Sequence, residues 1–166
     1  MRSFSIIFTC GLIMITVPFA NAEGRKVTAN VANAVIYPMS FEGKGLAPAM
    51  LHSVIALVPV ADRINLILKT GMATPLMVFQ PAPQFQIGVA NRFSDGFALG
   101  MTGIYRYTPH WSGTPSDAHF VGASVGPTVL LPSKIALVFP VAIAHNITTK
   151  QSSLSVAFEI MFQLPL

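Results

Sequence analysis

In the C-terminal part of the chain, every second residue is large and apolar, and the residues between are mostly small or polar. The apolar positions are Leu154, Val156, Phe158, Ile160, Phe162 and Leu164, and the residues between them are Ser155, Ala157, Glu159, Met161 and Gln163. Because successive side chains of a β-strand point to opposite faces, this period of two predicts a strand with one apolar face. The apolar face must then be covered, either by a protein core or by lipid.

The N-terminal segment has the features of an export signal. A positively charged start is followed by a mostly apolar stretch at 4–17, and Ala20-Asn21-Ala22 fits the small-x-small cleavage pattern. We expect residues 1–22 to be removed and residues 23–166 to form one mature domain. The alternative is an uncleaved anchor helix, but its apolar run is shorter than the roughly 20 residues that a span needs. Cys10 lies inside the expected signal, so the mature chain would form no disulfide and hold no cysteine-based site.

Charged residues make up only 10% of the chain, against about 25% in typical soluble domains. The longest apolar candidate for a spanning helix after the signal, Val54–Leu68, is interrupted by Asp62 and Arg63. An exported, charge-poor chain of this kind is typical of a closed β-barrel in the outer membrane of a Gram-negative-type bacterium. The basic excess is small and scattered, so the sequence does not predict binding to nucleic acid.

Turn residues divide the mature chain into eight expected strands. These strands are Val27–Ser40, Met50–Val60, Arg63–Ala73, Gln84–Arg92, Phe97–Tyr107, His119–Leu131, Ile135–Asn146 and Ser153–Leu164. The connections alternate between long or loose segments and tight turns, which is typical of outer-membrane barrels with short periplasmic turns. We therefore expect an all-β, antiparallel up-and-down transmembrane barrel with both ends of the chain at the periplasmic side. A meander of eight strands that resembles such a barrel by chance is the alternative.

The expected hairpins place apolar residues beside one another. Phe93 opposite Phe97 sets Val89 beside Met101 and Phe85 beside Tyr105. Likewise, Leu131 opposite Ile135 sets Val129 beside Leu137. Small residues then point inward, as the narrow interior of an eight-stranded barrel requires. Four prolines fall inside the expected strands, and each costs a ladder hydrogen bond or needs a bulge: Pro38, Pro59, Pro127 and Pro140.

Lys69, Arg106 and Glu159 are the charges expected on the inward face away from the strand ends. A charge on the lipid face would cost about 2–4 kcal/mol at mid-membrane, and an inward charge needs a partner or water. We therefore predict an ion pair between Lys69 and Glu159, with Arg106 able to share it. Such a pair could gate a narrow lumen, but a polar interior that only satisfies itself is the favoured interpretation.

Aromatic residues collect near the expected strand ends. Those near the outer ends are Tyr37, Phe41, Tyr105, Tyr107, Trp111 and Phe120, and those near the inner ends are Phe93, Phe97 and Phe162. The distribution is typical of the aromatic girdles that barrels place at both membrane interfaces. Ordinary packing within hairpins is the alternative.

The histidines do not predict a metal or catalytic site. His110 and His119 flank a loop that contains Asp117, but their spacing matches no known ligand pattern. Lipid A deacylases, which are small barrels, carry a His/Ser/Glu arrangement near their C-terminus. Here Ile147 occupies the position two residues after His145, and alternation places His145 on the lipid side. We therefore expect no catalytic residue, no metal and no cofactor.

The terminal strand, the Phe93–Phe97 hairpin and the alternating loop lengths together resemble the small outer-membrane barrels of the OmpA, OmpX and OmpW kind. The resemblance covers the whole mature chain as architecture. It implies outer-membrane lipid as the surroundings and the barrel-assembly machinery as a partner during insertion. Members of that group usually end in an aromatic residue that the machinery reads, whereas this chain ends in Pro165-Leu166.

Three functions are compatible with the sequence. The first is a non-enzymatic outer-membrane barrel that is structural, adhesive or a narrow passage for small solutes. The second is a barrel enzyme acting on lipid A or phospholipid. The third is a soluble periplasmic barrel of the lipocalin type, which would need a more charged outer face than these strands provide. The sequence does not indicate an oligomeric state.

Overall fold

The computed structural model describes residues 26–41, 47–76, 80–109 and 117–165. Its strands are β1 (Thr28–Ser40), β2 (Ala49–Pro59), β3 (Ile64–Pro75), β4 (Ala82–Ser94), β5 (Phe97–Thr108), β6 (Ala118–Leu131), β7 (Ile135–Val138), β8 (Val141–Asn146) and β9 (Gln151–Gln163). The expected signal peptide, residues 1–22, lies outside the described residues. In the ranges given above, no helix is long and apolar enough to cross a membrane.

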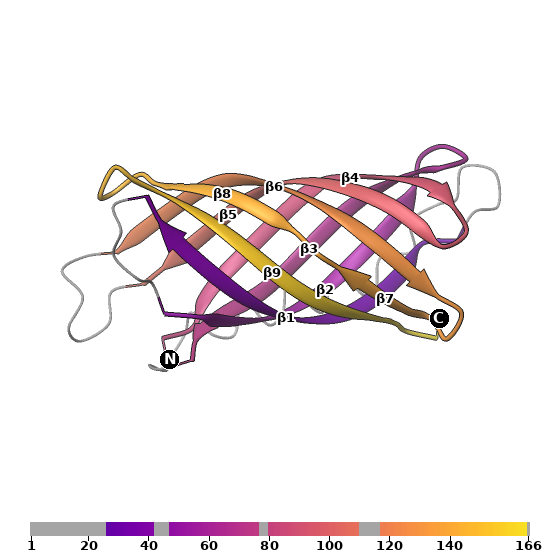
Figure 1. Ribbon diagram of the computed structural model, residues 1–166, viewed down its shortest axis with the longest axis horizontal. Coiled ribbons are helices and arrows are strands. Elements are labelled where there is room, and N and C mark those ends of the chain that lie inside the picture. The colour runs from indigo at the N-terminus through magenta and orange to yellow at the C-terminus, as the bar shows by residue number, and fades with distance from the viewer. Residues whose placement is uncertain (1–25, 42–46, 77–79, 110–116, 166) are drawn as a thin grey trace.

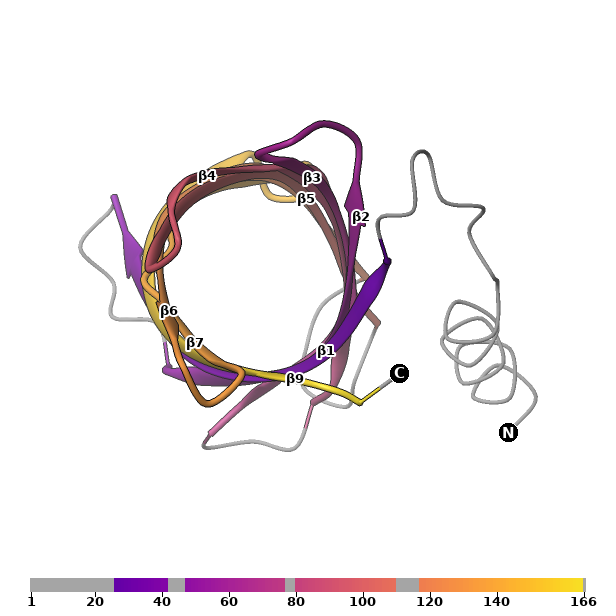
Figure 2. The same ribbon diagram turned by 90° about the vertical axis from the view of Figure 1, so that its right-hand side faces the viewer.

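The strands form one antiparallel sheet that closes on itself. Strands β1 to β6 pair in chain order, β7 and β8 both lie between β6 and β9, and β9 pairs with β1. Figure 1 shows the tilted strands from the side, and Figure 2 shows the closed ring along the barrel axis. Closure leaves no unpaired sheet edge. The β1–β9 ladder therefore confirms the expected barrel and excludes an open meander.

Strands β7 and β8 together occupy the place of the seventh expected strand. The expectation of one continuous strand from Ile135 to Asn146 is wrong, because pairing stops at Phe139 and Pro140. The register is unchanged across this break: Val138 faces Thr128 on one side of it, and Val141 faces Val125 on the other. Pro140 therefore costs ladder bonds without adding a bulge.

Gly126 makes room for this break. A Cβ atom built on Gly126 would lie 2.7 Å from Cα of Pro140, so a side chain at this position would collide with the opposite backbone. The ladder still holds on either side, because the Phe139 amide donates to the Pro127 carbonyl at 3.1 Å and the Ala157 amide to the Pro140 carbonyl at 2.9 Å.

The expected registers are confirmed except at one turn. Val89 faces Met101, Phe85 faces Tyr105, and Leu131 faces Ile135. The pairing of Phe93 with Phe97 is wrong, because the register shifts between Arg92 and Ser94 and places Ser94 opposite Phe97. The two phenylalanine rings remain neighbours, with centroids 6.0 Å apart.

The two faces of the sheet differ sharply. Large apolar side chains point outward along the strands, and Ile87, Met101 and Ile143 are 61%, 59% and 52% exposed. On the inner face, Ala34 and Ala73 are 2% exposed, and both belong to a cluster of buried apolar residues. An outer surface this apolar needs a nonaqueous environment, while the small inner residues leave the centre of the barrel open.

The connections differ between the two ends of the barrel. Strands β1, β3, β5 and β8 end at one end of the barrel, called here the loop end, and 41–48, 76–81, 109–117 and 147–150 separate them in sequence from the next strands. Strands β2, β4 and β6 end at the other, called the turn end, where 60–63, 95–96 and 132–134 separate them from the next strands. The first three separations at the loop end are longer than all of those at the turn end. Strand β1 starts and β9 stops at the turn end, where the Leu164 amide donates to the Ala29 carbonyl at 2.8 Å. This is the asymmetry that the sequence predicts.

Candidate functional site: the barrel lumen

A cavity of about 700 Å³ occupies the lumen. Its lining includes Thr28 and Gln163 at the turn end and Pro75 and Thr108 at the loop end. The cavity therefore extends along the length of the barrel. Its volume lies within the range of about 300–1,000 Å³ that is usual for small-molecule sites.

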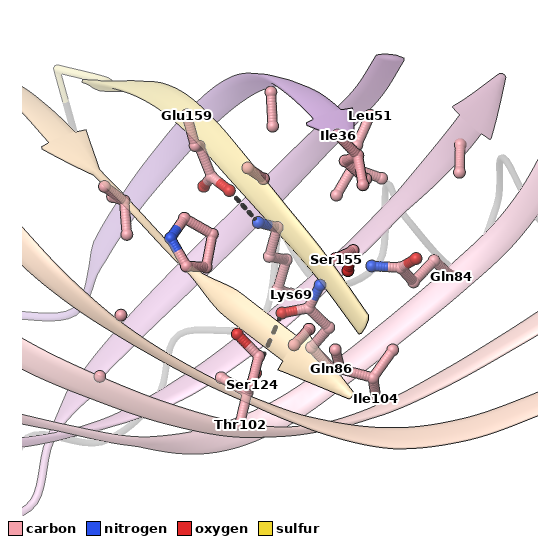
Figure 3. A pocket seen from close by; sticks show the side chains of 18 of the residues that line it. Ile36, Leu51, Lys69, Gln84, Gln86, Thr102, Ile104, Ser124, Ser155 and Glu159 are labelled. Atoms are coloured by element: carbon pink, nitrogen blue, oxygen red, sulfur yellow. Dashed lines mark hydrogen bonds and ion pairs between the residues drawn. The ribbon is translucent and has the colours of Figure 1, made fainter. Parts of the chain in front are cut away.

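Most of the cavity wall is apolar or made of small residues. The apolar side chains include Ile36, Leu51, Ile67, Ile104 and Leu130, and alanines recur on most strands. Figure 3 shows Ile36 and Leu51 on one side of the cavity and Ile104 on another, with a few polar groups between them. A wall of this composition can contact the apolar part of a small molecule and also offers polar groups along the lumen.

Lys69 and Glu159 form an ion pair inside the barrel. Nζ of Lys69 donates to Oε2 of Glu159 at 2.5 Å, and the two side chains are only 9% and 4% exposed. The pair joins β3 to β9, with β1 and β2 lying between these strands in the sheet (Figure 3). Since both charges are largely removed from water, each needs the opposite charge of the other to offset the free-energy cost of its burial. Nearby, Thr102 donates to the side-chain oxygen of Gln86 at 3.1 Å.

Arg106 does not share this pair. Its Cζ atom lies 4.3 Å from the centroid of the Phe120 ring, which belongs to the residue directly opposite on β6. The register explains the separation: Lys69 is level with Gln86 and Ile104, and Arg106 is two residues nearer the loop end than Ile104. The guanidinium group therefore stacks on an aromatic face at this end of the lumen.

The expected aromatic positions are only partly on the outer surface. Tyr37, Phe162 and Tyr105 are 52%, 41% and 39% exposed. Tyr107 is half-buried and donates to Oδ2 of Asp117 at 2.9 Å. Trp111 lies outside the described residues.

The placement of Phe120 in an outer girdle is wrong, because its side chain lines the lumen. The alternation along the strand indicates an inward side chain, since Phe120 lies two and four residues before Gly122 and Ser124, which the sequence places inward. The role of the outward aromatics as membrane girdles stays a prediction.

His119 and His145 both contact hydroxyl groups on neighbouring strands. Nδ1 of His119 lies 2.9 Å from the Tyr105 hydroxyl, and Nδ1 of His145 lies 3.0 Å from Oγ of Ser152. His110 lies outside the described residues. The sequence pattern does not indicate Ser152, because this residue lies on a different strand from His145. The register across the loop at 147–150 would have revealed it, since the two residues face each other.

No family model matches the chain, and no curated protein matches it. Solved structures do match, and they share the barrel. A de novo designed transmembrane β-barrel is 14% identical over 86% of this chain and 100% of the design, with a TM-score of 0.52. The attachment invasion locus protein Ail of Yersinia pestis is 5% identical over 83% of this chain and 97% of its own, with a TM-score of 0.55.

Neisserial surface protein A is 9% identical over 83% of this chain and 97% of its own, with a TM-score of 0.51. At such low identities, these likenesses concern the fold alone. The fold is therefore that of the small eight-stranded outer-membrane barrels, as the sequence pattern indicates.

Proposed function

We propose that the mature chain is a non-enzymatic outer-membrane barrel whose lumen is a narrow passage for small solutes. The observation that carries the proposal is the cavity of about 700 Å³, whose lining reaches both ends of the barrel. The outward apolar side chains support a membrane location, because an apolar surface of this extent is stable only against lipid or a protein partner. The barrel proteins matched by fold, Ail and Neisserial surface protein A, are consistent with this location.

The location is tested by cell fractionation and by gel electrophoresis with and without boiling. A membrane barrel is expected in the outer-membrane fraction, with a band that shifts on heating because the closed barrel resists detergent until it is boiled. Recovery as a soluble periplasmic protein would contradict the proposal and favour the lipocalin type.

The passage is tested by release of small fluorescent solutes from vesicles that contain the folded protein. Ala144→Trp places a large side chain in the lumen, and Ile143→Trp places the same side chain on the outer face next to it. We expect the first variant to slow release strongly and the second to behave like the native protein. Equal release from all three would contradict a passage through the lumen.

A second candidate function, hydrolysis of a lipid ester, is favoured by the contact between His145 and Ser152. Both side chains are exposed, close to the loop end. A histidine that accepts the proton of a serine hydroxyl can activate that hydroxyl as a nucleophile. Incubation of the folded protein with lipid A or phospholipid, compared with Ser152→Ala, tests this candidate. Released fatty acid that disappears in the variant would establish an enzyme, and no release from the native protein would exclude these substrates.

A further inference from the structure

Arg106 is a lumen cation with an unsatisfied donor within the part of the chain that the structure describes. Its Nε atom is buried and has no hydrogen-bond partner there. Leaving a buried donor unpaired costs about 1–3 kcal/mol, and more when the group is charged. Native proteins satisfy nearly all such groups, so an exception at the wall of a cavity needs an explanation, and a bound anion provides one.

The charges that line the cavity are strongly unbalanced. Among the described residues of the lining, the bases are Lys26, Lys69, Arg92 and Arg106, and Glu159 is the single acid. Glu159 is already paired with Lys69. Arg92, at the turn end, contacts Oδ1 of Asp95 at 2.8 Å. The lumen at Arg106 is therefore electropositive, and rings of arginine or lysine are how pores select anions.

The surroundings of Arg106 combine one charged group with apolar wall and with amide side chains such as that of Asn146 on β8, which faces Phe120 and also lines the cavity. Phe120 packs against the guanidinium group, Ile104 is the next inward residue toward the turn end, and Ala144 lines the same lumen. Gln84 faces Arg106 directly across the β4–β5 ladder and supplies an amide at the same level. An apolar pocket with a few convergent polar groups is the usual form of a small-molecule site.

We infer, on the basis of the proposed passage, that the lumen selects amphiphilic monoanions. The carboxylate or sulfonate head of such a molecule would accept hydrogen bonds from Arg106, whose planar fork of donors matches these groups. The alkyl or aryl body would occupy the apolar lumen between Arg106 and the ion pair of Lys69 with Glu159. A simple inorganic anion would contact only Arg106, and a neutral apolar solute would contact only the apolar lumen wall.

The binding test uses the folded protein in lipid nanodiscs, titrated by calorimetry against empty discs. Hexane-1-sulfonate carries both parts of the inferred ligand, methanesulfonate carries only the head, and hexan-1-ol carries essentially only the tail. We expect hexane-1-sulfonate to bind at least about tenfold more tightly than either partial probe, which corresponds to about 1.4 kcal/mol. Equal binding of hexane-1-sulfonate and hexan-1-ol would overturn the selection of anions. Equal binding of hexane-1-sulfonate and methanesulfonate would overturn the requirement for an apolar body.

Arg106→Gln is expected to reduce the affinity for hexane-1-sulfonate to that for hexan-1-ol, while Arg106→Lys keeps part of the preference because it keeps the charge. Arg92→Gln is the matched control, since it removes a lumen arginine at the other end of the barrel, and its affinity should stay within about twofold of the native value. Unchanged binding in Arg106→Gln would overturn the role of Arg106. The heat shift on gels reports whether each variant folds. If Arg106→Gln does not fold, Arg106→Lys and the three probes on the native protein test the role of Arg106 instead.

Failure of this inference is distinguishable from failure of the proposed passage. If solutes are still released from the vesicles but hexane-1-sulfonate and hexan-1-ol bind equally, the selection of anions is overturned and the passage is not. Selective binding without any vesicle release overturns the passage and leaves Arg106 as a closed binding site.

Discussion

Removing one partner of the Lys69–Glu159 pair should destabilise the barrel more than any other change of a single polar group in its lumen. Glu159→Gln keeps the size of the side chain but leaves Lys69, whose side chain is 9% exposed, without its counter-charge. Breaking a buried ion pair in this way costs about 3–5 kcal/mol. With a dependence on urea of about 2 kcal/mol per molar, a loss of about 3 kcal/mol lowers the unfolding midpoint by about 1.5 M.

The measurement is urea unfolding of the protein in lipid vesicles, followed by loss of the heat-modifiable band. Lys69→Met should cost a similar amount, and the double variant should recover most of the loss, because it buries no unpaired charge. Thr102→Val is the control: it removes the neutral hydrogen bond to Gln86 and should cost only about 1 kcal/mol. Additive losses in the double variant, or a midpoint shift in Glu159→Gln no larger than in Thr102→Val, would refute the reasoning.

The same variant separates a gate from a polar interior that only satisfies itself. Conductance of Glu159→Gln in planar bilayers should rise if the ion pair obstructs the lumen. Unchanged conductance together with lower stability would show that the pair has a structural role alone.

Other substitutions probe the two faces of the barrel. Ile87→Arg places a charge at mid-strand on the outer face, where Ile87 is 61% exposed, and should lower the free energy of unfolding in vesicles by about 2–4 kcal/mol. Ile64→Arg, at a strand end, should lower it by at most about 1 kcal/mol. Gly126→Ala should cost about 1–3 kcal/mol in the same assay because its Cβ has no room. Gly103→Ala is its control, since a Cβ there would lie 3.7 Å from the nearest atom. Mass spectrometry of the exported protein should show cleavage after Ala22, and an intact N-terminus would indicate an anchor.

The period of two in the sequence was enough to predict most of the fold. Each expected strand has its counterpart, with ends that differ by no more than two residues, because a slip in register would expose the wrong face of every strand. The interruption at Pro140 was not predicted, since the pattern does not say whether a proline bends a strand, adds a bulge or leaves a gap. The shift between Arg92 and Ser94 was missed for a similar reason: the exact turn geometry leaves no mark in the apolar alternation.

In the candidate site, the sequence predicted only the contact that follows from the charges of the residues. Lys69 and Glu159 were expected to pair because two inward charges of opposite sign have few alternatives, and the structure brings them together. Arg106 was expected near them, but its position depends on the register of β5 and on the aromatic face of Phe120. The contact of His145 with Ser152 joins two strands, so the residue pattern of one strand does not indicate it.

A membrane barrel requires that the odd-numbered residues of β4 from Phe85 to Asn91 face lipid and that the even-numbered ones between them face the lumen. Cys10 is the one cysteine of the chain and lies in the expected signal, so single cysteines can be placed along β4 and spin-labelled in vesicles. Collision with oxygen, which dissolves in lipid, and with a water-soluble nickel chelate then reports the surroundings of each label. Labels at Phe85, Ile87 and Val89 should meet oxygen and not nickel, and labels at Gln86 and Ala90 should show the lowest oxygen collision rates. A profile without alternation, or with the odd positions shielded from lipid, would contradict a membrane barrel.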